Sequence, residues 1–316
     1  MATITPVTHD RSAFKVRRIK LASGITLNVA LAGHEDAPPV ILLHGFPESH
    51  RTWRGVAPLL EPEFRLVMPD LRGFGASDRP QAVAAYAIDK LVADIFDLAD
   101  ALGIDCCALV GHDWGGAAAW AAALRGDPRI ERLAIVNAPH PLIFQKSLIE
   151  DSEQRAGSQY IRAFRDPGME AGVARMGLDA FFDKSFARHV DLASIPADER
   201  AQYIADWSRP GALTAMFNWY RASQIIVPAP GEDADIPAWV ARGVPVIRIP
   251  VLVAWGMNDR ALLPLQLDGL EDYCSDLIIR HLPEAGHFAP WEAPQAVADA
   301  LRPFLAARQT ATAPVQ

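Results

Sequence analysis

The most informative segment of this chain reads Leu109-Val110-Gly111-His112-Asp113-Trp114-Gly115-Gly116. It begins as a compact apolar run, passes through a turn flanked by glycines, and continues into an alanine-rich stretch. This order predicts a buried strand, a sharp turn and a helix, with Asp113 at the tip of the turn. A side chain at such a tip projects beyond the end of the strand, where a ligand can meet it.

This strand–turn–helix layout is that of a nucleophile elbow, in which the residue at the tip attacks a substrate. A serine at this place attacks acyl carbon. A carboxylate is a poor acyl nucleophile, because the product would be an anhydride. It can instead displace a leaving group from saturated carbon and form an alkyl ester. Asp113 therefore points to a strained or activated sp3 electrophile, such as an epoxide or a carbon–halogen bond.

Apolar runs on both sides of the elbow predict the rest of a sheet. Residues 14–32 are typical of a β-hairpin, and several later runs have the character of buried parallel strands. Helical patterns lie between them, roughly over 88–102 and 115–125, and this alternation favours parallel strands joined by crossovers. The expected buried strands are 40–43, 65–68, 108–110, 133–136, 251–255 and 277–281, followed by a final helix over 294–307.

A segment of different character separates the two groups of strands. Residues 142–223 contain no clear buried-strand run, and aromatic, arginine and acidic residues recur there at helical spacing. We therefore expect an α/β fold, a mostly parallel sheet flanked by helices, with an inserted helical cap. The expected parts are the first part of the core (1–140), the cap (141–225), and the return loop with the second part of the core (226–316).

Composition narrows the class of protein. The chain has 316 residues and a net charge of −8, and its basic residues are dispersed, so neither nucleic acid nor an anionic membrane is favoured as a partner. Residues 1–10 carry no signal-peptide pattern, and the apolar stretch 117–124 is too short to cross a bilayer. We expect a cytoplasmic protein, and its oligomeric state is not readable from the sequence.

The three cysteines are Cys106, Cys107 and Cys274, and their spacing matches no zinc site. Cys106 and Cys107 open an apolar run, so we interpret both as buried strand thiols, which fits a reducing cytosol. The chain also has neither a glycine-rich phosphate loop nor a cluster of ligating side chains, so no metal and no organic cofactor is expected.

Two further residues are placed to work with Asp113. Asp259 follows the expected strand 251–255, and His287 lies in a loop just past the strand that starts at 277. Ligands of open parallel sheets bind at the carboxyl ends of the strands, so the three residues are expected to meet there. In this arrangement His287 removes a proton from water, while Asp259 fixes its tautomer and stabilises the imidazolium.

Hydrolysis of an ester on Asp113 creates an oxyanion, which needs two backbone N–H donors. One is expected from Trp114, which directly follows the nucleophile. The other is expected from Phe46, in the tight loop 44–47.

With these motifs in place, the chain resembles the α/β-hydrolase superfamily and, within it, the soluble epoxide hydrolases. In that family two cap tyrosines bind the epoxide oxygen and protonate it as the ring opens. The resemblance implies that Tyr220 and Tyr160 do so here, on a small and mostly apolar epoxide. The matching motifs are His44-Gly45-Phe46-Pro47-Glu48, residues 70–78, residues 111–116, Asp259, Gly286-His287, Asn218-Trp219-Tyr220-Arg221, and Tyr160 before Pro167-Gly168.

Other functions use the same fold. Haloalkane dehalogenases share the aspartate nucleophile but usually have Asn where this chain has Phe46. Fluoroacetate-type dehalogenases place arginines just after the nucleophile, where this chain has Trp114 and Ala117. A haloalkane or haloacid dehalogenase is therefore the alternative to an epoxide hydrolase. A ligand-binding receptor with little turnover is a third hypothesis, against which the complete set of Asp113, Asp259 and His287 argues.

Overall fold

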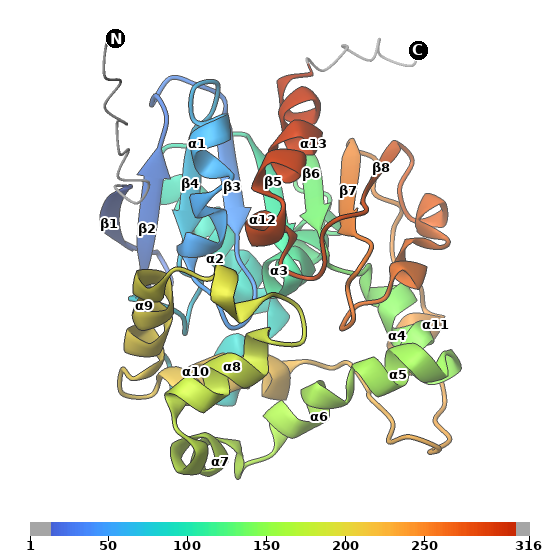
Figure 1. The fold of residues 1–316 in the computed structure, drawn as a ribbon. Helices are drawn as coiled ribbons and strands as arrows, with labels where there is room; N and C mark the ends of the chain where they lie inside the picture. Colours follow the sequence, from blue (N-terminus) through green and yellow to red (C-terminus); the bar gives the residue numbers. More distant parts are fainter. Residues whose placement is uncertain (1–13, 308–316) are drawn as a thin grey trace, which may run out of the picture.

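The structure is a computed structural model and describes residues 14–307. Within this part of the chain, eight strands form one sheet in the order β1-β2-β4-β3-β5-β6-β7-β8 (Figure 1). Strand β2 pairs antiparallel with β1 and β4, and all other neighbours are parallel, so the predicted mostly parallel sheet is confirmed. The strands are β1 (Lys15–Lys20), β2 (Thr26–Ala32), β3 (Pro39–Leu43), β4 (Arg65–Pro69), β5 (Cys107–His112), β6 (Ile130–Val136), β7 (Val251–Gly256) and β8 (Leu277–Leu282).

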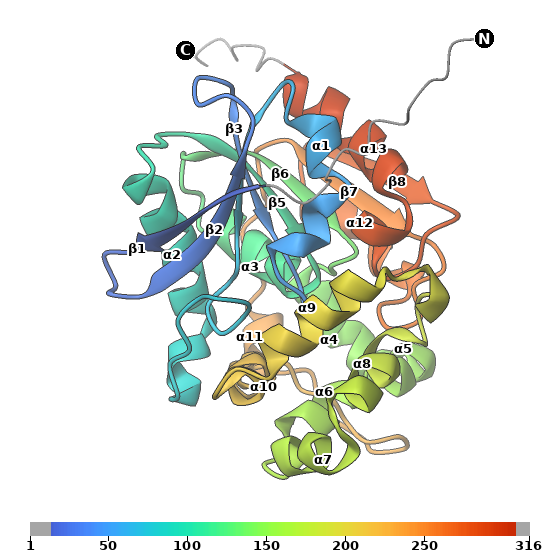
Figure 2. The same cartoon turned by 60° about the vertical axis from the view of Figure 1, so that its left-hand side comes forward.

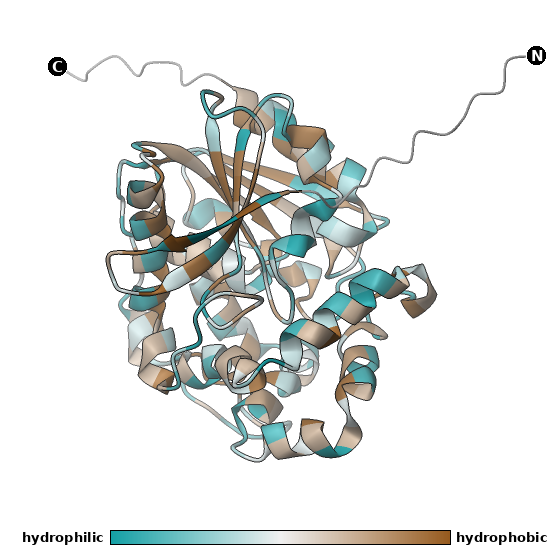
Figure 3. Cartoon of the chain, turned by 90° about the vertical axis from the view of Figure 1, so that its left-hand side faces the viewer, coloured by the Kyte–Doolittle hydropathy of each residue, from teal (hydrophilic) through white to brown (hydrophobic). Residues whose placement is uncertain are grey.

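The central strands form because apolar side chains cover both of their faces. In β3, Ile41 and Leu43 belong to the core on one side of the sheet, whereas Val40 and Leu42 belong to the core on the other. This alternation is the two-residue period of a strand buried on both sides. The edge strand β1 is mostly exposed and strongly basic, which discourages pairing with another sheet. Figure 3 shows the same contrast between apolar central strands and polar outer segments.

Helices cover each face of the sheet. On one face, α2 (Ile88–Ala101) and α3 (Asp113–Ala123) contribute Leu91, Val92 and Trp120 to the core. On the other face, α1 (Ala57–Leu60), α12 (Ala289–Glu292) and α13 (Pro294–Ala306) pack against alternate residues of the same strands. The two layers leave the carboxyl ends of the parallel strands free for the next part of the chain.

Seven helices between β6 and β7 gather at that end of the sheet, as Figures 1 and 2 show. We call them the insertion helices, and the helical character predicted for this segment is confirmed. A short helix, α11 (Ala238–Ala241), lies in the return segment 225–249 that leads to β7. The insertion helices are α4 (Pro141–Glu150), α5 (Ser152–Gly157), α6 (Gln159–Arg165), α7 (Met169–Met176), α8 (Leu178–Phe186), α9 (Ala197–Trp207) and α10 (Ala212–Ala222).

Some expectations differ from the structure. Cys106 is exposed, so its interpretation as a buried strand thiol is wrong. The reason is that β5 begins at Cys107, which is buried, while Cys106 still belongs to the preceding turn. Helix α3 begins at Asp113 itself rather than at Gly115. The segment examined for a signal peptide, 1–10, and the tail 308–316 lie outside the described residues. Among residues 14–307, no helix has both the length and the apolar character required to cross a membrane.

Candidate active site

The turn between β5 and α3 holds Asp113 in a strained conformation. Its φ angle is 49°, in the left-handed region that non-glycine residues seldom adopt. The flanking glycines are explained by close contacts. A Cβ atom added to Gly111 would lie 2.5 Å from the carbonyl oxygen of Gly115, and one added to Gly116 would lie 2.2 Å from Cβ of Ala138. The glycines therefore let strand and helix approach closely enough to present Asp113 at the tip.

Backbone donors surround the Asp113 carboxylate. The N–H of Phe46 donates to Asp113 Oδ1 at 2.7 Å. A Cβ atom on Gly45 would lie 2.4 Å from Cβ of Asp113, so only glycine lets this loop come so close. Trp114 is the second residue of α3, where backbone N–H groups have no acceptor within the helix. Both residues expected to supply donors thus lie beside the carboxylate.

His287 and Asp259 form a buried pair next to Asp113. The Nδ1–H of His287 donates to Asp259 Oδ2 at 2.8 Å, and its Nε2 lies 3.7 Å from Asp113 Oδ2. The second distance is too long for a hydrogen bond. The other oxygen of Asp259 accepts backbone N–H groups from Ala261 at 2.8 Å and Leu262 at 2.9 Å. The structure therefore brings together the three residues that the chain order placed at the strand ends.

Asn137, at the end of β6, is part of this cluster, and sequence reasoning missed it. Its side-chain amide donates to Asp259 Oδ2 at 2.9 Å, and its side-chain oxygen accepts the N–H of Gly256 at 2.9 Å. Its φ angle is 43°, a conformation that asparagine tolerates better than most residues. The one signal in the sequence is that an asparagine directly follows a buried strand. That strand, β6, lies between β5 and β7 in the sheet.

A second buried pair supports the loop that carries His287. His112 donates from Nε2 to the backbone oxygen of His287 at 2.8 Å, and its Nδ1 lies 3.4 Å from Glu48 Oε2. Both side chains are fully enclosed. Because His112 directly precedes Asp113, this contact ties the elbow to the His287 loop.

The electrostatics of the cluster favour a protonated His287. Burial opposes the charged imidazolium, but Asp259 and Asp113 outweigh burial and raise the pKa of His287 to about 9. Burial also disfavours the Asp259 carboxylate, yet the charge and hydrogen bond of His287, together with the N–H of Leu262 and the amide of Asn137, hold the pKa of Asp259 below its usual value. At neutral pH the pair therefore rests as imidazolium and carboxylate, beside the carboxyl group of Asp113.

Tyr160 on α6 and Tyr220 on α10 face each other above the carboxylate. Their ring centroids lie 6.1 Å apart in a nearly perpendicular arrangement, and the ring of Trp114 lies 5.1 Å from that of Tyr220. Burial, followed by the negative charge of Asp113, raises the pKa of both phenols well above 10. Both hydroxyl groups are therefore protonated over the physiological pH range.

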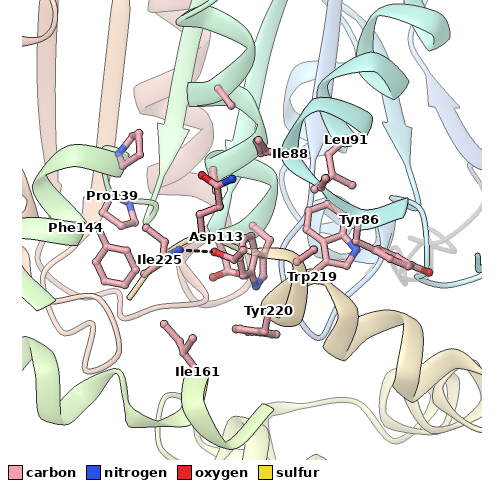
Figure 4. A pocket seen from close by; sticks show the side chains of 18 of the residues that line it. Tyr86, Ile88, Leu91, Asp113, Pro139, Phe144, Ile161, Trp219, Tyr220 and Ile225 are labelled. Atoms are coloured by element: carbon pink, nitrogen blue, oxygen red, sulfur yellow. Dashed lines mark hydrogen bonds between the residues drawn. The ribbon is translucent and has the colours of Figure 1, made fainter. Parts of the chain in front are cut away.

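Two cavities meet at Asp113, Tyr160 and Tyr220, which line both of them. The first arm has a volume of about 350 Å³ and the second arm about 540 Å³. Figure 4 shows Asp113 within the first arm, surrounded mainly by apolar and aromatic side chains. His287 lines the second arm. The first arm includes Ile88, Leu91, Trp114, Phe144, Ile161, Trp219 and Ile225, and the second includes Phe46, Phe164, Met169, Phe181, His189 and Phe288.

Comparison with known proteins shows which family the chain resembles. Residues 38–294 match the family described as the alpha/beta hydrolase fold. The AB hydrolase superfamily protein YfhM of Bacillus subtilis is 34% identical over 285 residues, which cover 90% of this chain and 95% of that protein. Epoxide hydrolase A of Mycobacterium tuberculosis is 31% identical over 324 residues, which cover 91% of this chain and 96% of that protein.

A solved structure also matches over nearly the whole chain. It belongs to a study of novel epoxide hydrolases of the alpha/beta hydrolases superfamily in metagenomes from hot environments. The two proteins share 47% sequence identity with a TM-score of 0.86, and the match covers 94% of this chain and 100% of the other.

Proposed function

Because the chain belongs to the α/β-hydrolase superfamily and, within it, to the epoxide hydrolases, we propose that it converts an epoxide to a vicinal diol through an alkyl ester on Asp113. The observation that carries the proposal is the carboxylate at the elbow tip, with a histidine–aspartate pair on one side and two protonated phenols on the other. A carboxylate suits attack on saturated carbon, and phenols suit an alkoxide leaving group.

In the first step, Oδ2 of Asp113 attacks a ring carbon while Oδ1 stays bound to the N–H of Phe46. The carbon–oxygen bond of the epoxide breaks, and the ring oxygen takes a proton from Tyr160 or Tyr220. The alkoxide is a far stronger base than a phenolate, so a phenol can protonate it even when burial holds the phenol's pKa above about 10. The products of this step are an ester on Asp113 and a phenolate.

In the second step, the ester no longer carries the charge of Asp113, which had helped to raise the pKa of His287. The imidazolium therefore releases its proton more readily, and that proton returns to the phenolate left by the first step. Neutral His287 then takes a proton from water, and the hydroxide attacks the carbonyl carbon of Asp113. The N–H groups of Phe46 and Trp114 bind the resulting oxyanion, and the loss of one such donor costs about 3 kcal/mol. Collapse expels the diol, which takes its proton from His287. The Asp113 carboxyl group, left with the other proton of the water, passes that proton to His287 and becomes a carboxylate again.

The key experiment traps the ester. Replacement of His287 with Gln removes the base but leaves the nucleophile, so the His287→Gln protein should accumulate substrate mass on the peptide that contains Asp113. A matched control is His281→Gln, an exposed histidine on β8, which should not accumulate an adduct. A protein that binds substrate yet stays unlabelled would count against the scheme.

Isotope labelling tests the site of water attack. A single turnover of the unmodified enzyme in heavy-oxygen water should place the isotope in the Asp113 carboxyl group, because the hydroxide attacks that carbon. If the isotope appeared only in the diol, water would have attacked the epoxide directly.

The dehalogenase alternative is tested in the same assay series. Epoxides, haloalkanes and haloacids are supplied separately to the purified protein, and diol and halide are scored as separate products. We expect diol from epoxides and no halide. Rapid release of halide from a halocarbon, with no diol from any epoxide, would favour the alternative.

A further inference from the structure

The two arms of the cavity differ in the charges that line them. Lys184 and Arg188 line the second arm, next to His189. Lys184 lies in the last turn of α8, and Arg188 follows the end of that helix. Within the described residues, the charged side chains that line the first arm are the acidic Asp89 and Asp113. Asp113 lines both arms, so the arms differ in that the first adds the acidic Asp89, whereas the second adds two cations.

These cations have no acidic partner among residues 14–307. Neither Lys184, Arg188 nor Arg260 takes part in an ion pair there. Asp183, the neighbour of Lys184, instead pairs with Arg200 at 2.5 Å. An exposed cation needs no partner in water, but Lys184 and Arg188 line the same arm and together make the electrostatic potential there more positive.

The ordinary explanation of a cation at a helix end covers only part of this pattern. Lysine in the last turn of α8 complements the helix dipole. Arg188 lies beyond the last turn of α8, where the effect of the dipole is greatest, so the dipole accounts chiefly for Lys184. Arg260 comes from a different segment, the loop after β7. Burial, together with the positive charges of His287, Arg188 and Arg260, lowers the pKa of His189 to about 4. Positive charge from two separate segments thus acts on one side chain of the second arm.

We propose that the second arm selects epoxides that carry an anionic group, such as a carboxylate, and that Lys184 and Arg188 bind this group at its mouth. The inference rests on the proposed function, because the reacting carbon must lie at Asp113, where the arms meet. The first arm cannot hold the charged end, since an unpaired charge in an apolar cavity is strongly disfavoured. The hydrocarbon part of the substrate therefore lies in the first arm and the anionic end points toward α8.

The test compares two substrates that differ only in charge, an epoxide with a terminal carboxylate and the matching primary amide. Each is assayed with the unmodified enzyme, with a double variant Lys184→Gln and Arg188→Gln, and with the control Arg175→Gln. Arg175 is an exposed cation on α7 that does not line either arm. We expect the double variant to lose about tenfold in kcat/KM for the carboxylate, chiefly through KM, and to keep its activity on the amide. The control should behave as the unmodified enzyme does.

Added salt gives a second readout, because exposed charges are screened at high ionic strength. The preference of the unmodified enzyme for the carboxylate should shrink as salt is added, whereas its activity on the amide should stay constant. Equal kcat/KM for both substrates in the unmodified enzyme would overturn the inference, as would an equal loss on both substrates in the double variant. Diol formed from the amide shows that the proposed function holds in either case, and diol from neither substrate would refute that function itself.

Discussion

The sheet and the insertion helices hold their functional side chains in different ways. Asp113, Asp259 and His287 follow the ends of β5, β7 and β8. One hydrogen bond from the Phe46 backbone holds Asp113, and a separate set from Asn137 through Asp259 holds His287. Tyr160 and Tyr220 stand on helices, and aromatic rings pack around them. The comparison indicates that a geometry which must stay constant is built on strand ends. Under the proposed function, the groups that bind the epoxide oxygen are built on packed helices.

Polar contacts join the two regions at several places, among them the ion pair of Arg51 with Glu199 and the hydrogen bond from Gln154 to the backbone oxygen of Ala261. The indole N–H of Trp219 donates to the backbone oxygen of Arg72 at 3.0 Å, and that of Trp207 donates to the backbone oxygen of Pro47 at 2.9 Å. Pro47 directly follows Phe46, whose N–H binds Asp113. Under the proposed function, Tyr160 and Tyr220 on the helices act in ring opening, so changes around them should alter that step more than ester hydrolysis.

The largest effect is expected when the sheet loses its nucleophile. The Asp113→Ala variant should lose roughly 10⁴-fold or more in kcat/KM, because no ester can form. The measurement is diol formation by the purified protein. Asp89→Ala is the matched control, since Asp89 also lines the first arm and is exposed, and it should retain most of the activity. Comparable losses in the two variants would contradict the role of the Asp113 carboxylate as the nucleophile.

A smaller effect is expected from the helices. Tyr220→Phe and Tyr160→Phe should each slow ring opening by about 10²-fold and leave hydrolysis of the preformed ester nearly unchanged. Rapid-mixing experiments that follow the two steps separately provide the check. Tyr273→Phe, at a tyrosine that stacks on His140 away from both arms, serves as the control. Equal slowing of the two steps would contradict the division of labour between helices and sheet.

Loss of the Asn137 side chain should act on the other step. The Asn137→Gly variant keeps a residue that tolerates a positive φ but removes one hydrogen bond to Asp259. A buried carboxylate that loses a donor is destabilised by about 1–3 kcal/mol, so we expect ester hydrolysis to slow roughly tenfold or somewhat more. Formation of the ester should be almost unaffected. If Asn137→Gly slowed only ring opening, Asn137 would not support Asp259 in ester hydrolysis.

The pH dependence provides the finest test. Ester hydrolysis needs neutral His287, so its rate should rise with pH through the pKa of that residue. The pKa is about 9 while Asp113 is charged, and the ester removes that charge, so the midpoint for ester hydrolysis should lie below 9. Single-turnover rates measured from pH 6 to 10 give the midpoint. A midpoint at or above the value of the resting enzyme would mean that the charge of Asp113 does not control the base.

Local patterns in the chain were enough to predict the sheet, the elbow, and the positions of Asp113, Asp259 and His287 after strands of that sheet. The reason is that strand periodicity, the steric need for glycine and the order of elements are all properties of neighbouring residues. The contact between Asn137 and Asp259 joins positions 122 residues apart, and no local pattern announces it. The exposure of Cys106 likewise depends on where β5 begins. The charged residues that distinguish the two arms depend on how α8 and the loop after β7 pack around one cavity. These contacts, exposures and cavity linings arise when folding brings distant segments together, so only the tertiary structure determines them.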